Sequence, residues 1–292
     1  KEILFQVEQM FVAFFSHLKM LEKNRICTCD ACATAPNLGL KIIVHCGDIQ
    51  FLNVKGNKKP FGNAVITAHR LLKNSIPNDN YALWSKELAD ALELKEKSAD
   101  TIFGLEEGSD LYDGAEAPYL YSLIDKDKLK LKLFEDPIEV DFTSAPNVFF
   151  EDTFASSASN LLEKITNYKY RHEWVDGVDS FEFNENEVTR LGTEHVCNVN
   201  GKQLDFVTVS KKVGPNEIVY GELTKSPPPV DELYSFYILE ALGEQETKVR
   251  LEVYWKAKSP LKKLLMLFVK GLLKKNSLDS FQKLKIYAEK GD

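Results

Sequence analysis

Long apolar runs are absent from this sequence of 292 residues. No stretch reaches the roughly 18 residues that a membrane-spanning helix needs, so we expect no transmembrane segment. The first residues follow the pattern of an amphipathic helix, which differs from the uninterrupted apolar core of a signal peptide. The sequence opens with Lys1 and not with methionine, and we therefore expect native sequence upstream of it.

Cysteine is scarce and unevenly placed. The sequence holds five cysteines, an odd number, and three of them fall within six positions. This arrangement does not resemble the paired framework that stabilises small secreted domains. We expect a reducing compartment, and we predict a cytoplasmic protein.

Several common site motifs are also missing. The sequence contains no Walker loop, no G-x-G-x-x-G and no H-E-x-x-H, which excludes ordinary P-loop, Rossmann and zincin sites. The net charge of −7 argues against nucleic acid as a partner. The charge is uneven, because residues 87–141 carry 16 acidic and 6 basic side chains whereas residues 256–290 carry 10 lysines and 2 acids. Those lysines are candidates for contact with anionic lipid headgroups, and the alternative is a solvated outer helix face.

The first half of the chain reads as a mixed α and β domain. Apolar residues three and four apart predict a helix over residues 3–21. Strands are expected at 38–45, 49–54 and 118–124, with a turn at 55–57 and helices at 62–73 and 85–94. The acidic stretch 95–113 is expected to be an excursion or flexible connection. We place the first domain at 1–136 and a linker at 137–146.

The second half, residues 147–292, has a different order of elements. A strand at 148–155 and a helix at 159–168 come first. A long helix at 260–290 closes the chain. Between them lie predicted strands at 178–183, 192–198, 204–211, 217–224, 233–241 and 247–255.

The first domain resembles a known family through two motifs. One is the helix Gly62–Leu71, which reads G-N-A-V-I-T-A-H-R-L; the other is the loop Cys27–Cys32, which reads C-T-C-D-A-C. Residues 1–124 resemble the class III nucleotidyl cyclase homology domain, and more closely a bacterial family of unknown function built on it. The resemblance implies a ferredoxin-like fold and a head-to-tail homodimer.

The resemblance gives little support to catalysis. Arg70 matches the arginine that the cyclase family uses in its transition state, but Ile66 stands where that family has asparagine. The two metal-binding aspartates of the family would precede Lys1. We therefore expect a domain that is not catalytic, with a cyclase-type enzyme that uses Arg70 and upstream aspartates as the alternative.

The cysteine loop is a candidate metal site. Cys27, Cys29 and Cys32 offer three thiolates within one loop, and thiolates suit zinc. For a fourth ligand we favour Cys46 and then His45; neighbours on a strand face opposite sides, so only one of the two can serve. The alternative is that these thiols are free or buried in a tight turn.

The second domain resembles the SRPBCC (START or polyketide-cyclase-like) superfamily. The resemblance rests on the segments Phe149–Ser156, Trp174–Val178 and Arg190–Thr193. It implies a helix-grip fold, in which a curved antiparallel sheet wraps a long C-terminal helix and commonly leaves an apolar cavity. The candidate ligand-binding residues are Tyr220, Tyr234, Tyr237, His195 and Phe268.

These patterns together favour a sensor or carrier that binds a small hydrophobic molecule or a lipid and does not catalyse. The first domain would then serve dimerisation or regulation. One alternative is a nucleotide-processing enzyme, and another is a structural scaffold that uses neither pocket. For chemistry inside the second domain, His195 with a nearby carboxylate is the only candidate pair.

Overall fold

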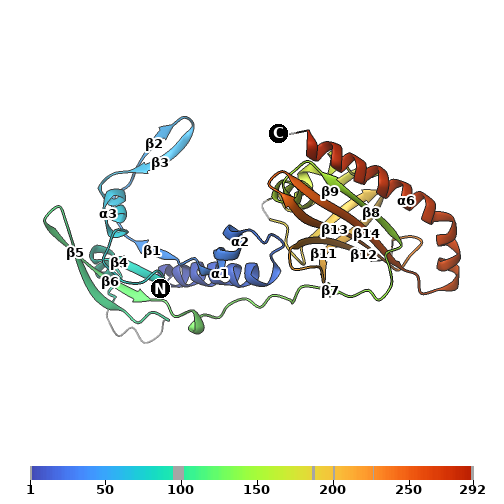
Figure 1. Cartoon of the computed structure of the whole chain (residues 1–292). Coiled ribbons are helices and arrows are strands. Elements are labelled where there is room, and N and C mark those ends of the chain that lie inside the picture. The colour runs from blue at the N-terminus through green and yellow to red at the C-terminus, as the bar shows by residue number, and fades with distance from the viewer. Residues whose placement is uncertain (1, 95–101, 186–187, 200, 226, 291–292) are drawn as a thin grey trace. The chain divides into compact units, whose positions relative to one another are not determined.

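The computed structural model describes residues 2–94, 102–185, 188–199, 201–225 and 227–290. Contacts divide the chain into two units (Figure 1). One unit comprises Lys1–Lys19 with Pro36–Phe134, and the other comprises Met20–Ala35 with Glu135–Asp292. Helix α1 (Glu2–Asn24) contributes residues to both units. The second unit is therefore discontinuous in sequence.

The first unit is built on a sheet with the strand order β1-β4-β6-β5. Its strands are β1 (Lys41–Val44), β4 (Tyr81–Ser85), β5 (Glu106–Tyr112) and β6 (Ala115–Leu123). The pairing of β1 with β4 is parallel, and the other two pairings are antiparallel. Every residue of β4 is buried, as expected for an apolar central strand.

Helices and a hairpin complete this unit. Helix α1 buries one apolar stripe that includes Phe11 and Phe15, while α3 (Asn63–Leu71) and α4 (Lys86–Ala91) follow strands. Hairpin β2 (Gln50–Val54) with β3 (Asn57–Phe61) is exposed along its length. Lys55 and Gly56 make its predicted turn with φ of 51° and 84°, a conformation that glycine adopts without strain. Short helical segments are α2 (Asp30–Thr34), η1 (Ala35–Asn37) and η2 (Lys126–Lys128).

Part of the acidic stretch predicted as an excursion is ordered. Residues 106–112 form β5, which pairs along its whole length with β6. The local composition of residues 106–112 does not predict this strand, because its stability comes from pairing with β6 and not from its own acidic sequence. Residues 95–101 lie outside the described residues. The ferredoxin-like fold stays a prediction for this unit.

The second unit contains an eight-stranded sheet with the order β8-β14-β13-β12-β11-β10-β9, and β7 pairs with β11 in parallel. All other neighbours along the sheet are antiparallel. The strands are β7 (Glu139–Val140), β8 (Val148–Phe154), β9 (Ser180–Glu182), β10 (Glu194–Val199), β11 (Lys202–Lys211), β12 (Glu217–Lys225), β13 (Glu232–Gly243) and β14 (Glu246–Lys256).

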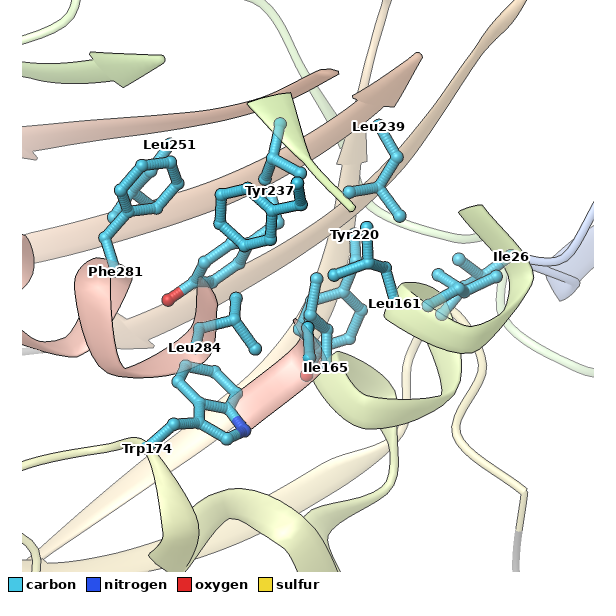
Figure 2. Close-up of a cluster of buried hydrophobic side chains, with 14 of the residues drawn as sticks. Ile26, Leu161, Ile165, Trp174, Tyr220, Tyr237, Leu239, Leu251, Phe281 and Leu284 are labelled. Atoms are coloured by element: carbon cyan, nitrogen blue, oxygen red, sulfur yellow. The ribbon is translucent and has the colours of Figure 1, made fainter. Parts of the chain in front are cut away.

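Three helical elements cover one face of this sheet. They are α5 (Ala158–Thr166), η3 (Tyr168–Glu173) and the long α6 (Pro260–Glu289). Figure 2 shows side chains from all of these layers meeting in one core, with Phe281 and Leu284 of α6 opposite Tyr237 and Leu251 of the sheet. Ile26 reaches the same core from the end of α1. An antiparallel sheet around a long C-terminal helix is the arrangement that the sequence predicted for this half.

The opposite face of the sheet has its own core. Tyr234, Phe236 and Tyr254 gather there, and Phe142 stacks on Tyr254 with ring centroids 3.9 Å apart. The segment predicted as a linker therefore covers this face, because it supplies both β7 and Phe142. Among the described residues, no helix is long and apolar enough to cross a membrane.

Candidate functional site

Strand alternation directs a set of polar side chains into the second unit. On β12, Tyr220 and Glu222 share the face that looks toward α5 and α6, since residues two apart on a strand point the same way. His195 on β10 stacks on Phe206 of β11, its cross-strand partner, with ring centroids 5.0 Å apart. Thr208 extends this row on β11 and is completely buried. Polar groups therefore collect on one stripe of an otherwise apolar interior.

The centre of this stripe is an ion pair between Arg171 and Glu222. Arg171 Nη2 donates to Glu222 Oε1 at 2.7 Å, and Nη1 donates to Oε2 at 3.3 Å. Tyr220 Oη lies between them, because it accepts from Nη2 at 2.8 Å and donates to Oε1 at 2.6 Å. Arg171 Nε donates to the carbonyl oxygen of Ile165 at 3.0 Å. The pair is thus bidentate and fixed from three sides.

Burial makes this pair unusual. The Arg171 and Glu222 side chains are only 4% and 8% exposed. Burial acts to raise the pKa of Glu222, but the charge of Arg171 and the hydrogen bonds from Arg171 and Tyr220 together outweigh burial and hold that pKa below its usual range. Burial likewise opposes the charge on Arg171, and the Glu222 carboxylate reverses this effect and raises the pKa of Arg171. Both side chains are therefore charged in the folded protein.

His195 sits beside the pair in its neutral form. Its Nε2 lies 3.5 Å from Glu222 Oε1, and neither ring nitrogen has a hydrogen-bond partner among the described residues. Burial lowers the pKa of His195 to about 4, and the positive charge of Arg171 adds to this effect against the pull of Glu222. The ring also packs on Tyr168 at 4.2 Å between centroids. At neutral pH the imidazole therefore carries no charge.

A cavity of about 180 Å³ opens beside the ion pair. Arg171 and Glu222 line it together with Cys197, Ser235 and Tyr237 of the sheet. Apolar side chains of the sheet form further walls of the cavity, and polar side chains of α6 line another side. These further lining residues include Val199, Phe206, Leu251, Val253, Asn276, Ser277 and Ser280. The cavity is therefore apolar for the most part, with one charged but internally neutralised wall.

The cysteine loop forms a second candidate site. The sulfur atoms of Cys27, Cys29 and Cys32 all lie within 4.8 Å of one another. Cys29 precedes α2, and its thiol pKa is lowered by a hydrogen bond from the backbone of Cys32 and by bonds with its neighbouring thiols. A hydrogen bond with Cys29, together with burial, raises the pKa of Cys32 to about 11. The loop thus brings three soft ligands close enough to share one ion.

The first part of the chain has a family match. Residues 1–81 match a family model described as a protein of unknown function (DUF2652). An uncharacterized protein of Mycobacterium tuberculosis is 32% identical over 85 residues, which is 29% of this chain and 40% of that protein. The chain thus spans about two fifths of the length of that relative. The predicted resemblance to a family of unknown function is confirmed in this form, and the cyclase-like part of it stays a prediction.

Solved structures with partial similarity cover about half of the chain. A hypothetical protein of Helicobacter pylori has a TM-score of 0.40 at 11% identity, over 48% of this chain and 86% of that one. The protein Ara h 8.0201 has a TM-score of 0.37 at 16% identity, over 48% of this chain and 95% of that one. The di-domain ARO/CYC protein BexL has a TM-score of 0.38 at 16% identity, over 47% of this chain and 44% of that one.

The predicted ligand-binding residues fall in three places. Tyr220 and Tyr237 lie in the core that α6 covers, and His195 lies beside Tyr168 on the same side of the sheet. Tyr234 lies on the opposite face, where Tyr234 Oη donates to Glu232 at 2.6 Å. Phe268 is 78% exposed on α6. Three of the five residues thus share an interior, and two do not reach it.

The residues singled out in the first unit are mostly at its surface. Arg70 Nη2 pairs with Asp113 at 2.5 Å, and both side chains are more than half exposed. Ile66 is half exposed on the same helix. Cys46 is exposed, and it belongs to the first unit whereas the other three ligand candidates belong to the second. Its role as a fourth ligand stays a prediction.

The ion pair itself was not predicted from the sequence. Arg171 lies in a short 3-10 segment, and Glu222 lies 51 positions later on β12, so no local motif joins them. One signal was available, because Tyr220 and Glu222 alternate with apolar neighbours on a strand where an acid is unexpected. The carboxylate predicted near His195, without an assigned residue, corresponds to Glu222 in this geometry.

Proposed function

We propose that the second unit binds a small, neutral, mostly apolar molecule that carries one carbonyl or hydroxyl oxygen. The observation that carries this proposal is the cavity lined both by apolar side chains and by the buried pair of Arg171 and Glu222. A domain selected only for stability gains little from such a pair, since apolar residues of similar volume often serve as well.

The size of the cavity limits the ligand. An apolar cavity of roughly 150 Å³ accommodates a benzene ring. A volume of about 180 Å³ therefore suits a molecule with a single ring or a short chain. A whole membrane lipid exceeds it, so among the predicted partners we favour the small hydrophobic molecule.

The polar wall determines the chemistry of the ligand. A guanidinium has five N–H donors. Four donor interactions of Arg171 go to Ile165, Tyr220 and Glu222, and among the described residues the second N–H of Nη1 has no acceptor. Glu222 already neutralises the charge, so a neutral oxygen fits this donor better than an anion does.

The test compares a ketone with a hydrocarbon of the same shape. Acetophenone should bind the full chain, with roughly fivefold higher affinity than α-methylstyrene, in which a CH2 group replaces the oxygen, because the oxygen gains one hydrogen bond. Ligand-observed NMR titration measures both. Val199→Phe, which fills the cavity, should abolish binding, whereas Val207→Phe on the opposite face should retain it. Equal affinity for both probes would exclude the polar contact, and equal binding by both variants would exclude the cavity.

The cysteine loop supports a second proposal. We infer that Cys27, Cys29 and Cys32 hold a structural zinc ion, because their sulfurs lie within the reach of one ion and thiolates are preferred zinc ligands. A closed zinc site has four ligands, and Cys46 is our first candidate for the fourth, ahead of His45. The role of the first unit in forming a homodimer or in regulation is likewise a proposal, which rests on its resemblance to cyclase homology domains.

A further inference from the structure

The first half of α6 exposes an unusual amount of apolar side chain. Phe268 is 78% exposed, Leu261 66% and Leu272 61%. Leu264, Leu265 and Leu267 are also exposed. Isolated exposed leucines are ordinary in soluble proteins, but a continuous set of this size marks an interaction surface.

Most of these residues share one side of the helix. At 100° per residue, Leu261, Leu264, Leu265, Phe268 and Leu272 fall on a single stripe. Met266, which is buried, faces the opposite side, so the stripe looks away from the core of the second unit. We call this stripe the outer apolar stripe. The rest of α6 differs, because Ile286 is the only large exposed apolar residue among the described residues from 273 onward.

The helix is anchored at its start and bent along its length. Ser259 caps it by accepting from Lys262 N at 3.2 Å, and Lys262 Nζ pairs with Asp231 at 2.6 Å. Figure 1 shows that the first part of α6 turns away from the direction of the rest. The stripe is therefore held in place by the fold and is not the frayed end of a helix.

By the same 100° spacing Lys275 lies on the stripe, and acids are absent from this part of the helix. From Lys256 to Leu278 the sequence has seven lysines and no Asp or Glu, in a chain whose net charge is −7. Lys256 and Lys262 pair with Glu232 and Asp231. In the part of the chain that the structure describes, no ion pair is found for the remaining helix lysines, which are Lys263, Lys270, Lys274 and Lys275.

We propose that the outer apolar stripe binds the surface of an anionic lipid bilayer. Leucine and phenylalanine side chains would enter the boundary between headgroups and acyl chains, and Lys275 would meet a lipid phosphate or carboxylate. The other lysines of this segment would add attraction to the anionic surface at longer range. The charge favours this occupant over a second copy of the chain, because two stripes in contact would bring one Lys275 near the other and two segments with lysines and no acids together. The proposal does not depend on the cavity holding a ligand.

Vesicle flotation with the full chain tests this proposal. The wild type should bind vesicles that contain phosphatidylserine, should bind pure phosphatidylcholine far less, and should dissociate at high salt. Phe268→Ser combined with Leu272→Ser should lower partitioning by about tenfold or more, since the anchoring side chains are lost. Lys275→Gln should lower it by about fivefold on the anionic vesicles alone, since one lysine contact with the surface is lost.

Matched controls separate the stripe from the rest of the helix. Ile286→Ser removes an exposed apolar residue of the same helix outside the stripe, and it should leave binding unchanged. All substituted positions are exposed, so thermal melting should be the same for each variant. Failure of the wild type to bind anionic vesicles would overturn the proposal. So would a dimer that becomes a monomer on Phe268→Ser with Leu272→Ser, because the stripe would then be a contact between copies.

Discussion

Arg171 Nη2 lies 2.7 Å from Glu222 Oε1 in the interior of the second unit, at the wall of its cavity. The two residues come from a short helical segment and a central strand, so the pair joins the helical layer to the sheet. Water is largely excluded from both side chains, and each charge depends on the other for its solvation. Loss of either partner should therefore destabilise the unit whatever ligand the cavity accepts.

Removal of one partner should be costly. Arg171→Met leaves the Glu222 charge buried without its partner and should lower the free energy of unfolding by about 3–5 kcal/mol, measured by urea denaturation. Arg171→Met with Glu222→Leu should lose less than the sum of the two single variants, because no uncompensated charge remains. Arg250→Met, at a more exposed pair with Glu217, is the control and should cost about 1 kcal/mol. Additive losses at Arg171 and Glu222 would show that the two charges are not coupled.

Stability should depend on pH through His195. The pKa of this imidazole falls from 6.5 to about 4 on folding, so the unfolded chain binds more protons between these values. The stability that His195 provides is therefore complete above pH 6.5 and is lost as the pH falls toward 4, by at most about 3 kcal/mol. Urea denaturation across this range measures the slope. His195→Phe should flatten it, and an unchanged slope would contradict the neutral buried ring.

The cysteine loop should bind one zinc ion per chain. Elemental analysis of the purified protein should show this stoichiometry, and a chelator should lower the melting temperature because a structural zinc adds to the folding free energy. Cys29→Ser should remove the metal, whereas Cys197→Ala, at a buried cysteine elsewhere in the same unit, should retain it. Cys46→Ser then tests the fourth ligand. Equal zinc content in all four proteins would show that the loop is not the site.

Phe142 covers the face of the sheet opposite the helices, and this contact gives a further prediction. Phe142→Ala removes the ring that stacks on Tyr254, and it should lower the free energy of unfolding by about 2 kcal/mol. Phe149→Ala is the matched control, because Phe149 is half exposed on β8 and should lose well under half of that amount. A loss at Phe142 in urea denaturation as small as the one expected at Phe149 would mean that the Phe142 ring does not stabilise the sheet.

Sequence patterns gave the sheet-and-helix order of the second unit but not the orientation of its side chains. Tyr234 and Tyr237 look equivalent in sequence, yet a separation of three on β13 places them on opposite faces. Knowing which face is interior requires the register with β12 and β14, and this depends on residues far along the chain. The loop of three cysteines was predictable because its ligands are local.

Helix α6 shows a different limit. Its leucines have helical spacing, which predicts a helix correctly, and core packing is the default interpretation of such a stripe. The second half follows this rule through Phe281 and Leu284. In the first half, Met266 is buried while Phe268 is exposed. Apolar residues occur on both sides of this half, so periodicity alone cannot assign the side that packs.

The packing of Ile26 into the second unit has a consequence for synthesis of the chain. This side chain leaves the ribosome early, but its core is completed by residues such as Leu239, 213 positions later. At typical rates of translation, Ile26 waits roughly 10–40 s before its partners exist. During that interval the chain between them can fold first, and the second unit closes only near the end of synthesis. A recombinant second unit that starts after residue 35 would lack this side chain and the Asn24 amide that donates to Leu191 O at 3.0 Å.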